Sequence, residues 1–379
     1  MPPALLQRID ASITDLDRAA KALASADLGE ILQTVKADFA DQIANSREEL
    51  VADRKAVENG CPIQECWSSF QGHRRKTAQL LLECLAFVQG VLLRRGGFDD
   101  GWCRVADRML MELKSAARLG WSSFTLPADC ESFASLAQII RLRFPSDGIW
   151  DLPVAAHEFG HFTASKILAT EPGVPYRTFD EFLKDEQAYA GSSWGTEHLH
   201  ELFADAFATF ALGPAYVRSC LYCRFSPGVA GVESDAEHPS YTSRARVILK
   251  VLEYMQAKEP GFSAARQTST QWWDSAVKDA GQVTEAGGES SLAYELVQLL
   301  RDWVPHAEYG GWARAQALSA RIMGAGQPAD ILAPETTAAD ILNAAWMARL
   351  SGNTPSLVNQ RAFALCDYLA GRPLFQQIV

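Results

Sequence analysis

The sequence predicts a mainly α-helical protein with a small β-sheet at most. Apolar residues recur at helical spacing through most of the chain, beginning with a coiled-coil-like stripe over residues 4–25 whose members alternate three and four apart. Segments with the two-residue period of a strand are sparse, which argues against a doubly wound α/β fold. Apolar residues make up 48% of the 379 residues, which is enough for a sizeable core.

We expect four regions along the chain: 1–60, an N-terminal helical hairpin; 61–120, a helical linker region; 121–262, a central region; and 263–379, a C-terminal helical region. The hairpin ends near Asn59-Gly60, and it either packs on the body of the protein or forms an arm for a protein partner. Two further amphipathic helices are expected over 75–95 and 103–118, separated by a turn rich in glycine and aspartate. The best strand candidate of the first half is 121–128.

Charge and hydropathy disfavour two classes of partner. The formal net charge of -11 argues against nucleic acid or an anionic membrane surface as the main partner. The basic stretch His73–Lys76 is interpreted as one solvated turn of a helix. The apolar run Leu80–Leu93 is interrupted by Glu83 and Gln89 and is too short to cross a bilayer, and no signal peptide opens the chain. We therefore expect a cytoplasmic protein without membrane insertion.

The cysteine pattern agrees with a reducing compartment. Eight cysteines are scattered without the spacing of a disulfide scaffold, so we expect reduced thiols. Cys220 and Cys223 form the one close C-x-x-C pair. The pair is compatible with half of a structural zinc site, but plain core cysteines on a helix are the better interpretation.

The most informative stretch is Pro153–Ser165, which contains the pattern His157-Glu158-x-x-His161. On a helix, residues four apart lie on one face, so both imidazoles can reach one ion at about 2.0–2.1 Å. Glu158 lies roughly 100° around the helix from His157, where it can reach a water beside the ion. Gly160 permits a close approach by another element. The pattern predicts a zinc site with Glu158 as general base; the alternative is a histidine pair satisfied by local hydrogen bonds.

A catalytic zinc needs a third protein ligand, and an apolar helix further along the chain offers several. Its ligand-capable side chains are Glu197, His198, His200, Glu201 and Asp205. Glu201 and Asp205 are four apart on one face, so one can bind the metal while the other supports the site. Burial of Asp205 among phenylalanine and alanine is costly unless it is paired, which indicates a functional role. Glu197 and His198 suit a helix cap or solvent, and His200 is a candidate hydrogen-bond donor to a ligand.

The two stretches together resemble the gluzincin pattern HExxH…ExxAD, most closely that of the CAAX prenyl protease and related stress-response metallopeptidases. The resemblance covers roughly residues 150–250 and implies a zincin-like catalytic core. It implies that zinc is bound by His157, His161 and Glu201, that Glu158 activates water, and that Asp205 supports the geometry. Members of that family are usually embedded in or anchored to a membrane, so this chain would be a soluble relative.

The resemblance extends to a His-Pro…Arg element, which matches His238-Pro239-Ser240-Tyr241-Thr242-Ser243-Arg244. His238 or Tyr241 is therefore expected to donate a hydrogen bond to the oxyanion of a tetrahedral intermediate. The alternative for His238 is an ordinary turn residue before a helix.

We expect a zinc metallopeptidase, a hydrolase that cleaves a protein or peptide substrate with metal-activated water. The N-terminal helices are a candidate site for a protein partner, and we expect the helical flanks either to occlude the cleft or to recruit a substrate. The alternative is a helical protein-interaction module with a structural or vestigial zinc site. The retained Glu158 favours the hydrolase, because a purely structural site has no use for a base beside its ligands.

Overall fold

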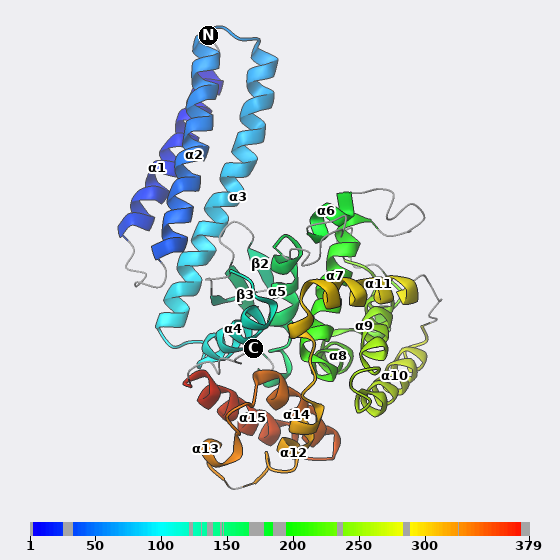
Figure 1. Cartoon of the computed structure of the whole chain (residues 1–379). Coiled ribbons are helices and arrows are strands. Elements are labelled where there is room, and N and C mark those ends of the chain that lie inside the picture. The colour runs from blue at the N-terminus through cyan, green and yellow to red at the C-terminus, as the bar shows by residue number, and fades with distance from the viewer. Residues whose placement is uncertain are drawn as a thin grey trace. The chain divides into compact units, whose positions relative to one another are not determined.

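The structure is a computed structural model of the whole chain (Figure 1). It describes residues 3–25, 33–120, 124–129, 131–134, 139–144, 146, 148–166, 178–184, 195–232, 238–282, 289–324 and 326–372. The elements in chain order are α1 (Pro3–Ser25), α2 (Gln33–Glu58), α3 (Ile63–Arg95), α4 (Trp102–Ala117), β1 (Thr125–Ala128), β2 (Ser132–Ala134), β3 (Ile139–Arg143), α5 (Val154–Ala164), α6 (Phe179–Lys184), α7 (Thr196–Leu212), α8 (Pro214–Ser219), α9 (Tyr241–Met255), α10 (Phe262–Asp279), α11 (Glu289–Trp303), α12 (Trp312–Ser319), α13 (Pro328–Ile331), α14 (Ala338–Leu350) and α15 (Pro355–Ala370). The predicted fold class, mainly α with a small sheet, is confirmed.

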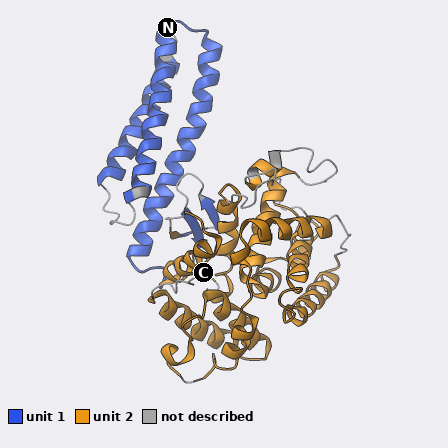
Figure 2. Ribbon diagram, in the orientation of Figure 1, with its two compact units in different colours: residues 1–100, 126–144 blue, residues 101–125, 145–379 orange. Residues whose placement is uncertain are grey.

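The chain divides into two compact units (Figure 2). Unit 1 comprises residues 1–100 and 126–144, and unit 2 comprises residues 101–125 and 145–379. The expected hairpin corresponds to α1 and α2, and α3 belongs to the same unit as this hairpin. The helices that carry the sequence motifs, α5 and α7, share unit 2 with the C-terminal helices.

Three long helices, α1, α2 and α3, lie side by side in unit 1 (Figure 1). The apolar stripe of α1 is buried there at Leu5, Ile9, Leu16 and Leu23. On α2, the ring of Phe39 lies 5.2 Å from that of Phe87 on α3. The hairpin therefore uses its stripe to pack on α3 within the same unit.

A buried polar contact ties the same helices together. Asp53 of α2 accepts a hydrogen bond of 2.6 Å from Ser69 Oγ, and its other oxygen lies 2.8 Å from His73 Nδ1, both on α3. His73 is the first residue of the basic stretch, so that residue faces α2 rather than solvent alone.

The sheet of three strands has the order β1-β3-β2, and β2 runs antiparallel to β3 with Phe133 opposite Ile140. The strand expected over 121–128 is found at Thr125–Ala128, whereas its residues 121–123 lie outside the described part of the chain. Gly90 of α3 allows β1 to approach closely, because a Cβ at this glycine would lie 3.0 Å from Leu126 Cβ.

One described helix, α3, is long and apolar enough to cross a membrane, as judged by length and composition alone. The apolar run Leu80–Leu93 is only part of α3, which has 33 residues. Of its most apolar 18-residue window, 33% is buried inside the protein. Core helices of soluble proteins meet the same criterion, so the finding is compatible with a soluble protein. Leu82, Leu85 and Leu92 of α3 are exposed.

The centre of unit 2 is α7, which is buried without interruption from Glu201 to Leu212. Helices α5, α8, α9 and α11 pack against it. This burial explains why the helix is so apolar and why each polar residue within it needs a partner. Cys220 and Cys223 lie in a π-helical turn, Cys220–Arg224, that follows α8.

Candidate metal centre

The site begins with a close crossing of α5 and α7. A Cβ on Gly160 would lie 2.7 Å from Ala204 Cα and 3.1 Å from Ala204 Cβ. Only glycine on α5 opposite a small residue on α7 permits this approach. His157 and His161 flank Gly160, and Glu201 lies one turn before Ala204, so the crossing brings all three side chains to one place. The close approach expected at Gly160 is thus confirmed.

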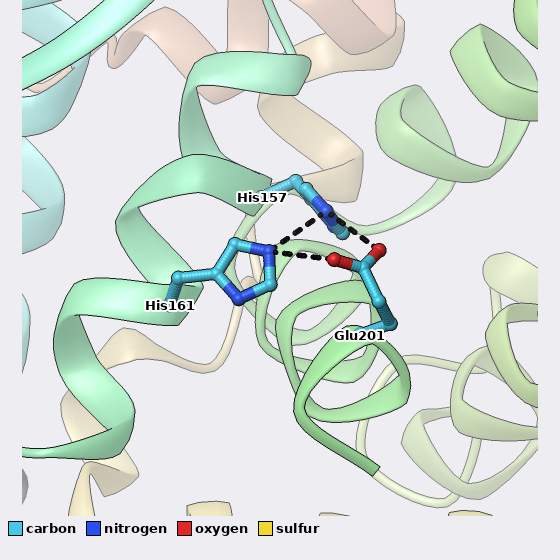
Figure 3. Close-up of side chains that lie close together, drawn as sticks. All are labelled: His157, His161 and Glu201. Atoms are coloured by element: carbon cyan, nitrogen blue, oxygen red, sulfur yellow. Dashed lines mark hydrogen bonds and ion pairs between the residues drawn. The ribbon is translucent and has the colours of Figure 1, made fainter. Parts of the chain in front are cut away.

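The three side chains converge (Figure 3). His157 Nε2 lies 3.3 Å from His161 Nε2 and 3.4 Å from Glu201 Oε2, and His161 Nε2 lies 3.1 Å from Glu201 Oε1. Four ligands placed tetrahedrally at about 2.0–2.1 Å from zinc are themselves about 3.3 Å apart. The observed separations match that spacing, and two imidazoles with one carboxylate are a donor set that zinc takes. The residues therefore fit a zinc ion.

Two further side chains contact the Nδ1 atom of His157, on the side of the ring away from the other metal-ligand candidates. Asp205 Oδ1 and the Tyr216 hydroxyl each lie 3.1 Å from His157 Nδ1. Tyr216 donates a hydrogen bond of 2.5 Å to Asp205 Oδ1, and its ring is nearly parallel to that of His157 at 6.3 Å. With Nδ1 engaged in this way, His157 presents Nε2 toward His161 and Glu201.

Arg244 of α9 completes this group of contacts. Its Nε and Nη2 each donate a hydrogen bond of 2.8 Å to one oxygen of Asp205, and its Nη1 lies 3.4 Å from Glu201 Oε2. Asp205 is fully buried, so this two-pronged ion pair supplies the partner that its burial requires. Asp205 thus contacts both His157 and Arg244, and its supporting role stays a prediction.

The electrostatics of the site favour a cation. Burial alone would lower the pKa of His157, but Asp205 and Glu201 outweigh it and raise the pKa to about 9. Burial would likewise raise the pKa of Glu201, yet the two histidines and Arg244 hold it well below its usual range. Glu201 and Asp205 face one guanidinium, that of Arg244, so the carboxylates of the site outnumber its arginine. A divalent cation would offset the excess negative charge.

Glu158 differs from the other acidic groups of the site. Its side chain is buried, with 8% relative exposure, and within the described part of the chain it makes no hydrogen bond or ion pair. A buried carboxylate with no protein partner is unfavourable unless water satisfies it. The residue between the two histidines is therefore available to accept a proton.

The remaining candidates are placed differently. His238 Nε2 lies 3.9 Å from Glu201 Oε1, and its side chain is 39% exposed, so it stands at the rim of the site. Tyr241 opens α9 and stacks on Phe225 at 5.1 Å, and in the described part of the chain it forms no hydrogen bond or ion pair with a metal-ligand candidate. His200 meets Phe179 edge-on at 5.6 Å, and Glu197 is exposed in the first turn of α7.

Sequence reasoning missed Tyr216 and gave no role to Arg244. Tyr216 lies on α8, where no motif marks it, and its only signal is its place shortly after the helix of Glu201. Arg244 ends the His-Pro…Arg element, so the sequence marked its position. The sequence did not indicate that its partner would be Asp205. Among the described residues, Cys220 and Cys223 belong to no metal-ligand cluster, and Cys220 is buried in the core.

In comparisons with known proteins, the chain matches no protein-family model, no curated protein and no solved structure.

Proposed function

We propose that the protein is a zinc-dependent endopeptidase that hydrolyses a protein or peptide substrate in the cytoplasm, as a soluble relative of the gluzincins. The observation that carries the proposal is Glu158, whose carboxylate has no protein partner in the described part of the chain and which stands between two histidines that converge with Glu201. A structural zinc site needs the three ligands but has no use for this group.

His157, His161 and Glu201 would hold the zinc. When bound there, zinc supplies a Lewis acid that polarises the scissile carbonyl and acidifies water. Glu158 accepts the proton of the attacking water and delivers it to the nitrogen of the leaving amine. Asp205, Tyr216 and Arg244 keep His157 and Glu201 in place during the reaction. His238 stands at the rim, where a donor to the substrate oxyanion is expected.

The variant Glu158→Gln tests this proposal, because glutamine has nearly the same shape and cannot take up a proton from water. We expect zinc content to stay at the wild-type level while cleavage falls by roughly 10²–10⁴-fold. The readouts are metal analysis of protein purified without added zinc and a proteome-wide comparison of cleavage products. Glu197→Gln, at an exposed position of α7, is the matched control and should change neither readout.

Each outcome separates the hydrolase from its alternative. A Glu158→Gln variant that cleaves as well as the wild type contradicts the role of the base. Zinc stoichiometry that survives His157→Ala contradicts the metal site. If the wild type binds zinc but yields no cleavage product, the result supports the interaction module, with zinc in a structural role.

A protein partner for unit 1 belongs to the same proposal. The exposed apolar side chains of α3, Leu82, Leu85 and Leu92, offer a contact surface for a helix of a substrate or adaptor protein. Replacing these three residues with glutamine should leave cleavage of short peptides intact and remove a subset of the protein cleavage products. Identical product sets for the variant and the wild type would argue against recruitment through α3.

A further inference from the structure

Among the described residues of unit 2, a buried arginine also lacks a partner. Arg218 lies on α8, and only 5% of its surface is exposed. Its Nε and Nη1 are cut off from solvent and donate no hydrogen bond. The side chain forms no ion pair either, in the part of the chain that the structure describes.

The described residues around Arg218 supply no counter-charge. The guanidinium lies 6.0 Å from the centre of the Trp312 ring. Among the described residues, Tyr222 is the one ionisable group whose charge acts on it, and burial raises the pKa of that phenol, so it is neutral near pH 7. Burial lowers the pKa of Arg218 to about 10, which still leaves the guanidinium charged near neutrality.

Other arginines of unit 2 have the carboxylate partner that Arg218 lacks among the described residues. Arg244 donates two hydrogen bonds of 2.8 Å to the buried Asp205, and Arg314 donates one of 2.9 Å to the buried Asp340. Each buried carboxylate is neutralised by its arginine. An uncompensated buried charge is strongly unfavourable, so an arginine that stays charged at this depth requires a counter-anion.

We propose that Arg218 is the core of a binding site for a small oxyanion, a phosphate or carboxylate group, covered on one side by Trp312. The planar fork of a guanidinium matches the paired oxygens of such anions and donates to them bidentately. The Trp312 ring lies on one side of the guanidinium, where a cation and an aromatic face attract each other. No residue of this site is shared with the metal centre.

The place of Arg218 on its helix separates the two sites. Tyr216 lies two residues earlier on α8 and turns its hydroxyl toward Asp205 and His157. Residues two apart on a helix point roughly 200° away from each other, so Arg218 faces the other side of α8. The oxyanion site therefore does not depend on the proposed hydrolase activity.

The test compares the full-length wild type with Arg218→Met in sodium phosphate, sodium acetate and sodium chloride at equal ionic strength. Phosphate and acetate represent the two sources of oxyanion, and the larger effect identifies the preferred one. At a concentration about one hundred times the dissociation constant, binding to the folded state should raise the melting temperature of the wild type by roughly 3–8 °C over chloride. In Arg218→Met this rise should disappear.

Three controls make the result specific. His161→Ala removes a metal-ligand candidate and should keep the anion response, which excludes an effect through bound zinc. Arg314→Met removes an arginine that already has its carboxylate, and it should also keep the response. Arg218→Lys keeps the charge without the fork, so calorimetry should show phosphate binding at least about tenfold weaker than in the wild type.

The proposal is overturned if the wild type melts at the same temperature in all three salts, or if Arg218→Met responds to phosphate as the wild type does. If Arg218→Met does not fold, Arg218→Lys decides: equal phosphate affinity in this variant and in the wild type would also overturn the proposal.

Discussion

Replacing Gly160 with alanine perturbs the crossing of α5 and α7 directly. The added Cβ would lie 2.7 Å from Ala204 Cα, whereas carbon atoms in contact are about 3.5–4.0 Å apart. The helices must then separate by close to an ångström, or the backbone must distort. Glu201 lies one turn from Ala204, so the same shift moves it away from His157 and His161, which exceeds the roughly 0.2 Å tolerance of a metal–ligand distance.

The expected magnitude follows from two opposing effects. Overpacking a tight contact costs about 1–3 kcal/mol, and replacing a helical glycine with alanine recovers up to about 1 kcal/mol. We expect a net loss of about 1–2 kcal/mol, which corresponds to a fall in melting temperature of roughly 2–8 °C. Zinc affinity should fall by about tenfold or more. Thermal unfolding and competition with a chromophoric chelator measure the two quantities.

Gly72→Ala is the matched control, because Gly72 lies inside α3 and a Cβ there meets nothing within 4 Å. This variant should gain about 0.5–1 kcal/mol and bind zinc as the wild type does. If Gly160→Ala also became more stable and kept wild-type zinc affinity, the crossing would not set the geometry of the site.

Two further predictions concern the residues behind His157. Tyr216→Phe keeps the ring but removes the hydroxyl that contacts Asp205 and His157, so zinc affinity should fall about tenfold in the chelator assay; an unchanged affinity would mean that Asp205 alone orients His157. Burial would raise the pKa of Asp205, but Arg244 and His157 outweigh it and lower the pKa from 3.8 to about 2. A lowered pKa contributes stability that is present above pH 3.8 and is lost as the pH falls toward 2, here about 2 kcal/mol. Urea unfolding of Asp205→Asn should therefore vary less between pH 4 and 2 than that of the wild type, and equal slopes would contradict the ion pair.

Local periodicity explains which parts of the fold were predictable. The stripe of α1 repeats over several turns, so its burial followed from the sequence, and the turn at Asn59-Gly60 was marked by its glycine. The start of α3 was expected near residue 75 but lies at Ile63. Only Cys66 and Phe70 are buried in its first turns, so the apolar period is weak there. The pairing of β1 with β3 depends on contacts between segments and has no local signal.

The candidate site shows the same division between local and tertiary information. The spacing of His157 and His161 is a property of one helix, and the structure brings both imidazoles to one point as that spacing requires. Glu201 was chosen through helical phase and resemblance, and it lies beside both histidines. Tyr216 reaches His157 only because α8 folds back onto α7, so no spacing within a single element could reveal it.

The carboxylates of Glu158, Glu201 and Asp205 have different contacts, and these contacts suit them to different roles. Asp205 accepts hydrogen bonds on both oxygens from Arg244 and is fully buried, so it has no free position for a proton from water. Glu201 points one oxygen to each histidine, which suits a metal ligand. Within the described part of the chain, Glu158 alone among the three has no protein partner. We therefore propose Glu158 as the general base, because a general base must exchange a proton with water.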